Sequence, residues 1–162
     1  MPIDSQKTKV LFVCLGNICR SPMAEAVFAH MVRQQGLDER FYIDSAGTAG
    51  YHVGSSPDRR SVSTCRSHNV PVKHSARQVC EQDFKEFDYI LCMDRSNLED
   101  LRDMQPRGSK AHVSLFGAYD EERPNSIIED PYYGGQSGFE VNFQQVSRCS
   151  KGLLRTLGHT QQ

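Results

Sequence analysis

The stretch from Val10 to Pro22 constrains the fold of this chain more than any other part of its sequence. Val10 to Val13 form an uninterrupted apolar run, which predicts a short β-strand buried on both faces. Ser21 is a good N-cap, and Pro22 suits the first helical position because its missing N–H would have no partner there. The helix that they begin is predicted to end near Gly36 and to carry one apolar face, made of Ala24, Val27, Phe28, Met31 and Val32.

The loop between this strand and this helix, residues 14–20, is predicted to bind an anion. Backbone N–H groups ahead of a helix converge there, with the positive end of the helix dipole behind them. Gly16 and Asn17 tolerate the left-handed backbone that such a nest of N–H groups requires. Cys14 opens the loop and would be a thiolate beside these donors. Arg20 closes it with a planar fork that matches two oxygens of a tetrahedral anion.

This combination predicts a thiolate nucleophile that attacks a phosphomonoester. A nucleotide-binding P-loop is excluded, because the loop has no second glycine followed by lysine and serine or threonine. A strand, turn and helix with a merely buried cysteine would explain the apolar run but not an arginine at the helix start.

Two segments resemble the low-molecular-weight protein tyrosine phosphatases. One is the loop Cys-x5-Arg-Ser, written CLGNICRS, near the N-terminus, and the other is Asp130-Pro131-Tyr132-Tyr133 near the C-terminus. Several unrelated phosphatase folds share Cys-x5-Arg, but its early position together with the late second segment is specific. The resemblance covers about residues 8–157. It implies one domain over residues 1–162, hydrolysis of phosphotyrosine and other aryl phosphates through a phosphocysteine, and no metal or organic cofactor.

The resemblance also implies roles for individual residues. Cys14 would be the nucleophile, Arg20 would stabilise the phosphate, and Asp130 would be the general acid, with Glu129 as the alternative that the residues alone leave open. Inorganic phosphate or another oxyanion would bind the backbone of Leu15, Gly16, Asn17, Ile18, Cys19 and Arg20. A network of Asn17, Ser21, Ser45 and His74 would brace the loop, and Tyr51, Tyr132 and Tyr133 would form the walls of a pocket deep enough for a tyrosine ring.

Cys19 is the expected redox partner of Cys14. Both lie on one curled loop, within the Cα separation of about 4.4–6.8 Å that a disulfide allows. Peroxide is therefore expected to produce a reversible Cys14–Cys19 disulfide.

The rest of the chain predicts an α/β fold with three layers. Further strands are expected over residues 41–47, 89–93 and 111–116, and helices over 58–68, after Asp94 or Ser96, and along a final apolar face from Phe139 to Leu153. Alternating strands and helices indicate a four-stranded parallel sheet with helices on both faces. The strand order 2-1-3-4 is implied by the resemblance. Ligands of such sheets bind at the carboxyl ends of the strands, where Cys14 is expected.

Composition narrows the partners and the compartment. With 19 Lys and Arg against 20 Asp and Glu, the chain has no excess charge that would recruit nucleic acid or an anionic membrane. No apolar run approaches the length of a membrane span or resembles a signal peptide. Six cysteines without a Cys-x2-Cys pair indicate reduced thiols in the cytoplasm and no structural metal. The expected partners are tyrosine-phosphorylated proteins.

Three alternatives remain open at this point. A thioredoxin-coupled arsenate reductase shares the loop and fold but needs two relay cysteines, for which only Cys65, Cys80 and Cys92 are available. A protein-arginine phosphatase of the same family carries threonine at the position of Ile18. A phosphotyrosine-binding module with an inactive loop is disfavoured, since Cys14, Arg20 and Asp130 are all present.

Overall fold

The computed structural model describes residues 7–132 and 135–159. Four parallel strands form one sheet in the order β2-β1-β3-β4, which is the predicted order. Their bounds are β1 Thr8–Cys14, β2 Phe41–Gly47, β3 Tyr89–Cys92 and β4 His112–Leu115. β1 lies at the centre, where the chain turns first to β2 on one side and then to β3 on the other. This reversal is the switch point at which sheets of this class bind ligands.

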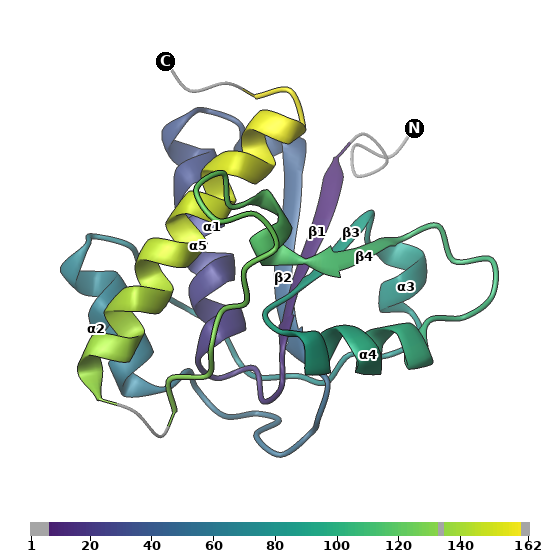
Figure 1. Cartoon of the computed structure of the whole chain (residues 1–162), viewed down its shortest axis with the longest axis horizontal. Helices are drawn as coiled ribbons and strands as arrows, with labels where there is room; N and C mark the ends of the chain where they lie inside the picture. The colour runs from purple at the N-terminus through teal and green to yellow at the C-terminus, as the bar shows by residue number, and fades with distance from the viewer. Residues whose placement is uncertain (1–6, 133–134, 160–162) are drawn as a thin grey trace.

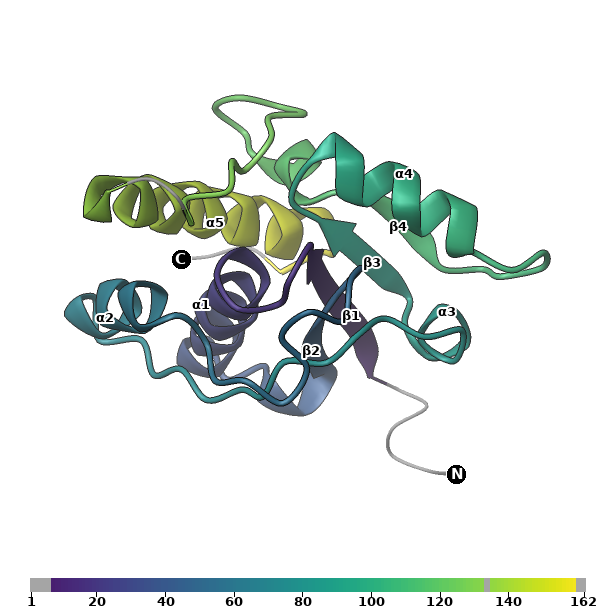
Figure 2. The ribbon, with the colours of Figure 1, turned by 90° about the horizontal axis from the view of Figure 1, so that it is seen from below.

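Five α-helices cover the two faces of this sheet. Their bounds are α1 Arg20–Gln34, α2 Arg59–Ser67, α3 Asp83–Glu86, α4 Arg95–Met104 and α5 Gln136–Thr156. Two 3₁₀ turns, Asp38–Arg40 and Phe116–Tyr119, complete the described elements. α1 and α5 pack on one face of the sheet with α2 outside them, whereas α3 and α4 lie on the other face (Figures 1 and 2). The predicted three-layer α/β fold is confirmed.

The apolar run of β1 joins two hydrophobic cores. Val10 and Phe12 face the core under α1 and α5, and Leu11 and Val13 face the core under α3 and α4. All four side chains are fully buried, as expected for a central parallel strand. Cys14 is paired in register with Gly47 of β2, so the nucleophile lies where two strands end together.

Three helix boundaries test the expected capping residues. Gly36 follows α1 with φ 70°, in the left-handed conformation expected after a helix. Asp94 caps α4 in a reciprocal pair with Asn97, which settles the choice between Asp94 and Ser96. The prediction that Ser21 caps α1 is wrong. α1 begins at Arg20 after Cys19 without a side-chain cap, because the Ser21 hydroxyl is used inside the loop instead.

Two further features complete the fold. Phe116 begins a 3₁₀ turn rather than ending the fourth strand, which stops at Leu115. Among the described residues, no helix is both long enough and apolar enough to cross a membrane.

Candidate active site

The loop from Cys14 to Arg20 lies at the carboxyl end of β1 and leads directly into α1. It forms the floor of a cavity of about 250 Å³. The lining brings together most of the residues that the sequence singled out, and it adds His52. These residues are Cys14, Leu15, Gly16, Ile18, Cys19, Arg20, Tyr51, His52, Asp130 and Tyr132.

Cys14 is almost fully buried, with 3% of its surface exposed, and two groups approach its sulfur. The Asn17 backbone N–H donates to Cys14 Sγ at 3.3 Å, and Ser21 Oγ lies 3.1 Å from the same sulfur. A thiolate has no proton to give, so in that state Ser21 is the donor of this contact. The Asn17 N–H and the Ser21 hydroxyl therefore both hold the Cys14 sulfur in place.

Asn17 is the centre of the network that holds the loop. It is fully buried and has a left-handed backbone with φ 59°. Its Nδ2 donates to Ser21 Oγ at 2.7 Å and to Ser45 Oγ at 3.1 Å. Its Oδ1 accepts from His74 Nε2 at 2.7 Å and from the Arg77 backbone N–H at 3.0 Å. The structure therefore brings Asn17, Ser21, Ser45 and His74 together around one amide.

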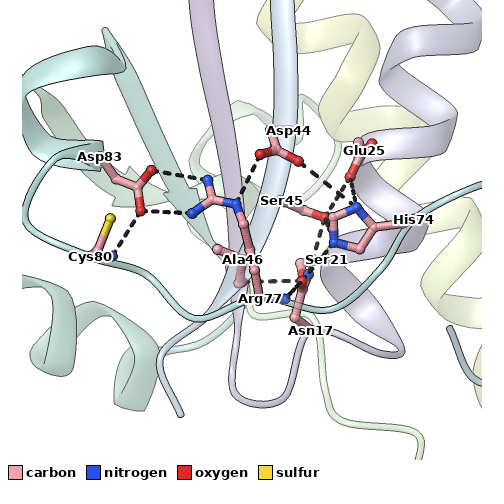
Figure 3. A network of polar contacts seen from close by, with 10 residues as sticks. All are labelled: Asn17, Ser21, Glu25, Asp44, Ser45, Ala46, His74, Arg77, Cys80 and Asp83. Carbon is pink, nitrogen blue, oxygen red and sulfur yellow. Dashed lines mark hydrogen bonds and ion pairs between the residues drawn. The ribbon is translucent and has the colours of Figure 1, made fainter. Parts of the chain in front are cut away.

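The network continues to the carboxylates of Glu25 and Asp44 (Figure 3). Ser45 Oγ donates to Glu25 Oε1 at 2.6 Å, and His74 Nδ1 lies 3.1 Å from the same oxygen and 3.9 Å from Asp44 Oδ1. The ligand atoms of Glu25, Asp44 and His74 all lie within 4.8 Å of one another, an arrangement that suits a metal ion. Ser45 donates to Glu25, and Arg77 donates to Asp44 Oδ2, so both carboxylates also belong to the hydrogen-bond network around Asn17.

Arg20 is held by partners that the sequence did not indicate. Its Nη1 donates to Asp94 Oδ2 at 2.6 Å and to the Ile128 carbonyl at 2.9 Å, and its Nη2 lies 3.8 Å from Asp130 Oδ2. Burial works to lower the pKa of Arg20, but the charge on Cys14 and the hydrogen bond and charge of Asp94 outweigh it and raise that pKa. The guanidinium therefore stays charged in a buried position on the cavity wall.

Asp130 lines the same cavity, next to the Arg20 guanidinium. Its side chain is 43% exposed, and its Oδ1 accepts from the Tyr132 backbone N–H at 3.0 Å. Glu129 is exposed, and the cavity lining includes Asp130 rather than Glu129. The geometry therefore favours Asp130 between the two candidate acids.

Of the three tyrosines predicted to form the walls of the pocket, the structure describes two. Tyr51 and Tyr132 both line the cavity and are 76% and 37% exposed, so their rings form its rim. Tyr133 lies outside the described residues. Ile18 also lines the cavity and is half-buried.

Residues at the start of α2 hold both loops, and sequence reasoning missed this. The Asp58 backbone N–H donates to the Ile18 carbonyl at 2.7 Å, and Ser61 Oγ donates to the Cys19 carbonyl at 3.0 Å. Arg60 Nη2 donates to the Tyr132 carbonyl at 2.9 Å. The only signal in the sequence was the predicted start of this helix at residue 58.

His52 was also missed. The expectation that Gly16 has a left-handed backbone is wrong, because in the loop 14–20 only Asn17 adopts that conformation. A Cβ atom on Gly16 would lie 2.8 Å from His52 Cδ2, so a larger residue at position 16 would have to displace the His52 ring.

Cys19 differs from Cys14 in its surroundings. Its pKa is raised far above the ordinary value, first by burial and then by the negative charges of Asp58 and Cys14. It therefore stays a neutral thiol beside the nucleophile, in the same cavity.

Comparisons with known proteins agree with this geometry. Residues 9–162 match the sequence profile described as low molecular weight phosphotyrosine protein phosphatase. The human protein of that name is 52% identical over 152 residues, which are 92% of this chain and 96% of the human one. A tyrosine phosphatase from Entamoeba histolytica, solved with Hepes in its active site, superimposes with a TM-score of 0.90 at 38% identity, covering 93% of this chain and 97% of that one.

A Drosophila arginine phosphatase gives a TM-score of 0.89 at 37% identity and covers 95% of this chain and all of its own. Family profile, sequence identity and fold coincide over more than nine-tenths of the chain, which therefore belongs to the low-molecular-weight phosphotyrosine protein phosphatase family.

Proposed function

We propose that this protein hydrolyses phosphotyrosine in proteins, with Cys14 as the nucleophile. The observation that carries the proposal is the convergence of Cys14, Arg20 and Asp130 on one cavity, which residues of the loop 14–20 also line. The sulfur lies beneath that loop, already contacted by the Asn17 N–H and the Ser21 hydroxyl. Such a site presents a nucleophile, a positive charge and an acid to one phosphoryl group.

The reaction has two steps. In the first, the Cys14 thiolate forms an S–P bond while the P–O bond to the tyrosine ring breaks, and Asp130 gives its proton to the leaving oxygen. In the second, water attacks phosphorus, Asp130 takes a proton from it, and inorganic phosphate leaves as the thiolate is restored. Arg20 and the N–H groups of residues 15–20 stabilise the charge on the phosphoryl oxygens in both steps.

Selectivity for tyrosine is proposed to come from the cavity walls. Tyr51, Tyr132 and Ile18 surround the approach to Cys14 with apolar surface that suits a flat ring. Phosphoarginine is the second candidate substrate, favoured by the structural similarity to the Drosophila arginine phosphatase. Its guanidinium N–H groups would face the hydrocarbon of Ile18, and an unpaired polar group in a closed pocket costs about 1–3 kcal/mol.

The test is to measure kcat/KM on phosphotyrosine and on phosphoarginine for the wild type and for Ile18→Thr. Wild type should prefer phosphotyrosine by at least about tenfold, which is the effect of one such unpaired group. Ile18→Thr adds an acceptor and should narrow the preference, chiefly by raising turnover of phosphoarginine. A wild-type preference for phosphoarginine would overturn the tyrosine assignment. An unchanged ratio in Ile18→Thr would move selectivity to Tyr51 and Tyr132.

We also propose that Cys19 protects Cys14 from irreversible oxidation. Peroxide would oxidise the Cys14 thiolate to a sulfenic acid, and the Cys19 thiol would attack that sulfur, forming a disulfide and releasing water. The two thiols line one cavity, which supports the pairing. Because the pKa of Cys19 is raised, its proton must leave as the S–S bond forms, and it goes to the hydroxyl that departs from Cys14 as water. Peptide mapping after peroxide treatment should find a Cys14–Cys19 disulfide that a thiol reverses. Recovery of Cys14 as sulfonic acid beside a free Cys19 would contradict the proposal.

The whole chain, residues 1–162, is proposed to act as one domain in the cytoplasm. Strands β1, β2 and β3 contribute residues to both cores, which supports cooperative folding of the whole. The six cysteines are free thiols, which suits a reducing compartment. One unfolding transition in calorimetry and recovery in the cytosolic fraction of cells are the expected results. Two transitions, or recovery from the medium, would contradict them.

A further inference from the structure

The segment from His74 to Val79 runs beside the edge strand β2 and supports the active-site loop from outside. It lies outside the four strands, and Gln78 makes only an isolated bridge to Gly47. Arg77 uses both of its backbone groups here. Its carbonyl accepts from the Gly47 N–H at 2.8 Å, and its own N–H donates to Asn17 Oδ1 at 3.0 Å.

The Arg77 side chain is clamped between two carboxylates from different elements (Figure 3). Its Nε donates to Asp44 Oδ2 of β2 at 3.0 Å. Its Nη1 and Nη2 each donate to one oxygen of Asp83, at the start of α3, both at 3.0 Å. Burial alone would lower the pKa of Arg77, but the hydrogen bonds and charges of Asp83 and Asp44 outweigh it and raise that pKa.

The clamp has a rigid base. Asp83 is 5% exposed, and its Oδ2 also accepts from the Cys80 backbone N–H at 2.9 Å. Asp44 directly precedes Ser45, whose hydroxyl accepts from Asn17 Nδ2. A bidentate arginine–carboxylate pair fixes direction as well as distance. The guanidinium therefore ties an irregular segment to the sheet and to α3 at the residue that contacts Asn17.

Asn17 depends on such outside support. Its left-handed backbone is costly for a residue other than glycine and persists where surrounding bonds hold it. Both donors to its Oδ1, His74 Nε2 and the Arg77 N–H, come from the clamped segment. The Asn17 N–H in turn points at Cys14 Sγ from 3.3 Å.

We propose that Arg77 is a positioning residue of the phosphatase site, acting through Asn17. Its side chain, held by Asp44 and Asp83, sets its own backbone N–H against Asn17 Oδ1 and so aims the Asn17 N–H at the nucleophile. The inference rests on the proposed function, because the loop that it positions is the one that would bind the phosphoryl group. An ion pair that only joined β2 to α3 would contribute to stability without affecting that loop.

The chain offers a matched control for this distinction. Arg148 also clamps a buried carboxylate, Asp120, through Nε and Nη2, both at 3.2 Å. Its side chain is 29% exposed, against 32% for Arg77. The Asp120 pair lies between the 3₁₀ turn at Phe116–Tyr119 and α5, and neither of its members lines the active-site cavity. Arg148→Gln therefore removes a similar clamp that does not line the active-site cavity.

The experiment compares Arg77→Gln, Arg77→Lys and Arg148→Gln with the wild type. The measurements are the unfolding midpoint, kcat and KM on para-nitrophenyl phosphate, and the dissociation constant of inorganic phosphate by calorimetry. Both glutamine variants should unfold at lower temperature. Arg77→Gln alone should lower kcat by about tenfold or more and weaken phosphate binding, because small displacements of catalytic groups cost large factors in rate. Arg77→Lys should fall between, since a point charge cannot span both carboxylates.

Two results would overturn the proposal. One is an Arg77→Gln enzyme with kcat and phosphate affinity within about twofold of wild type, below the scale of a lost positioning contact. The other is an Arg148→Gln enzyme that loses as much kcat as Arg77→Gln does, when both variants lower the unfolding midpoint by the same amount. If Arg77→Gln does not fold, Asp83→Asn is measured instead, because it keeps the hydrogen bond between Arg77 and Asp44. Asp83→Asn should then lower kcat and phosphate affinity by a smaller factor. A normal kcat in Asp83→Asn would also overturn the proposal. A wild type that binds phosphate but does not hydrolyse para-nitrophenyl phosphate would contradict the proposed function. The phosphate affinities of the Arg77 variants would still test the positioning role.

Discussion

Of the three loops that line the cavity, those that carry Cys14 and Asp130 are held in different ways. In the loop 14–20, Cys14, Asn17 and Arg20 are each at most 3% exposed, and their polar atoms bond to side chains from several elements. The loop that carries Asp130 is open to solvent. Its bonds to the helices are made mainly through its carbonyl groups, which accept from the side chains of Arg60, Asn142 and Gln145.

This difference fits the work that each loop is proposed to do. The nucleophile and the anion-binding N–H groups stabilise charge most when they need no rearrangement. A loop in which Cys14, Asn17 and Arg20 are buried and held by hydrogen bonds meets that need. The acid meets a leaving group that must enter and depart, and such residues usually lie on exposed loops over a rigid scaffold. The first loop should therefore be sensitive to changes in hidden partners, and the second chiefly to the loss of Asp130 itself.

The largest effect should come from Cys14→Ser. The hydroxyl does not ionise near neutral pH, so turnover of aryl phosphates should fall by at least about 10⁴-fold. Phosphate binding should survive, because Arg20 and the loop N–H groups remain. Steady-state kinetics and calorimetry with inorganic phosphate measure the two properties, and Cys80→Ser, which changes an exposed thiol outside the cavity, is the control. Substantial turnover in Cys14→Ser would exclude Cys14 as the nucleophile.

The second effect in size should come from Asp130→Ala. Loss of a positioned general acid lowers the rate by about 10²–10⁴-fold. The loss should shrink for leaving groups that depart without a proton, so a series of aryl phosphates of falling leaving-group pKa is the measurement. Glu129→Gln, the adjacent exposed carboxylate, should stay close to wild type. An equal loss in Asp130→Ala across the whole series would place the acid elsewhere.

The contrast between the loops also explains what the sequence predicted. The loop 14–20 was predictable from the local sequence. Val10 to Val13 indicate the strand before it, and Cys14, Gly16 and Arg20 together indicate an anion-binding site. Strand order and the choice of Asp130 over Glu129 came from the family resemblance. Nothing in the local sequence distinguishes two neighbouring acids that differ only in which one faces a cavity formed by distant residues.

The missed residues share one physical cause. Asp94 was predicted as a helix cap, and it is one through Oδ1, but its Oδ2 holds Arg20. Asp58 likewise caps α2 while its backbone N–H bonds the Ile18 carbonyl. Ser21 is the reverse case, a predicted cap that the loop uses instead. In each case the local sequence already explains the residue as a helix cap. Its second role depends on residues that are distant in the sequence and becomes visible only when the sheet brings the strand ends together.

Ser21→Ala tests how far the first loop depends on hidden partners. The change removes the hydroxyl 3.1 Å from Cys14 Sγ and the acceptor of Asn17 Nδ2. A hydrogen bond to a charged group contributes about 1.5–3 kcal/mol, so kcat should fall by about 10–100-fold. Ser61→Ala is the matched control, since that buried hydroxyl donates to the Cys19 carbonyl rather than to the sulfur. Equal losses in the two variants would show that packing, and not the contact with sulfur, matters.

The smallest effect should come from Arg60→Gln, which loosens the second loop without touching Asp130. Arg60 donates to the Tyr132 carbonyl, and its guanidinium lies 5.5 Å from the centre of the Tyr132 ring and 4.7 Å from that of Phe139. Tyr132 in turn donates its backbone N–H to Asp130, so Arg60 acts on the acid through one intermediate. Removing this partly exposed anchor of the loop should lower kcat by roughly fivefold, because it displaces the acid only indirectly.

The signature of that loss is its dependence on the leaving group. If Arg60 positions the acid, the effect of Arg60→Gln should be greatest on leaving groups that need a proton and should vanish in an Asp130→Ala background. Arg59→Gln makes the same change in charge one residue earlier on α2 and should leave kcat unaltered, which separates anchoring from the general field of α2. A fivefold loss of kcat that persisted in the Asp130→Ala background would mean that Arg60 acts on the substrate or on the loop 14–20. In that case Arg60 would contradict the distinction between a rigid loop for the nucleophile and a tethered loop for the acid.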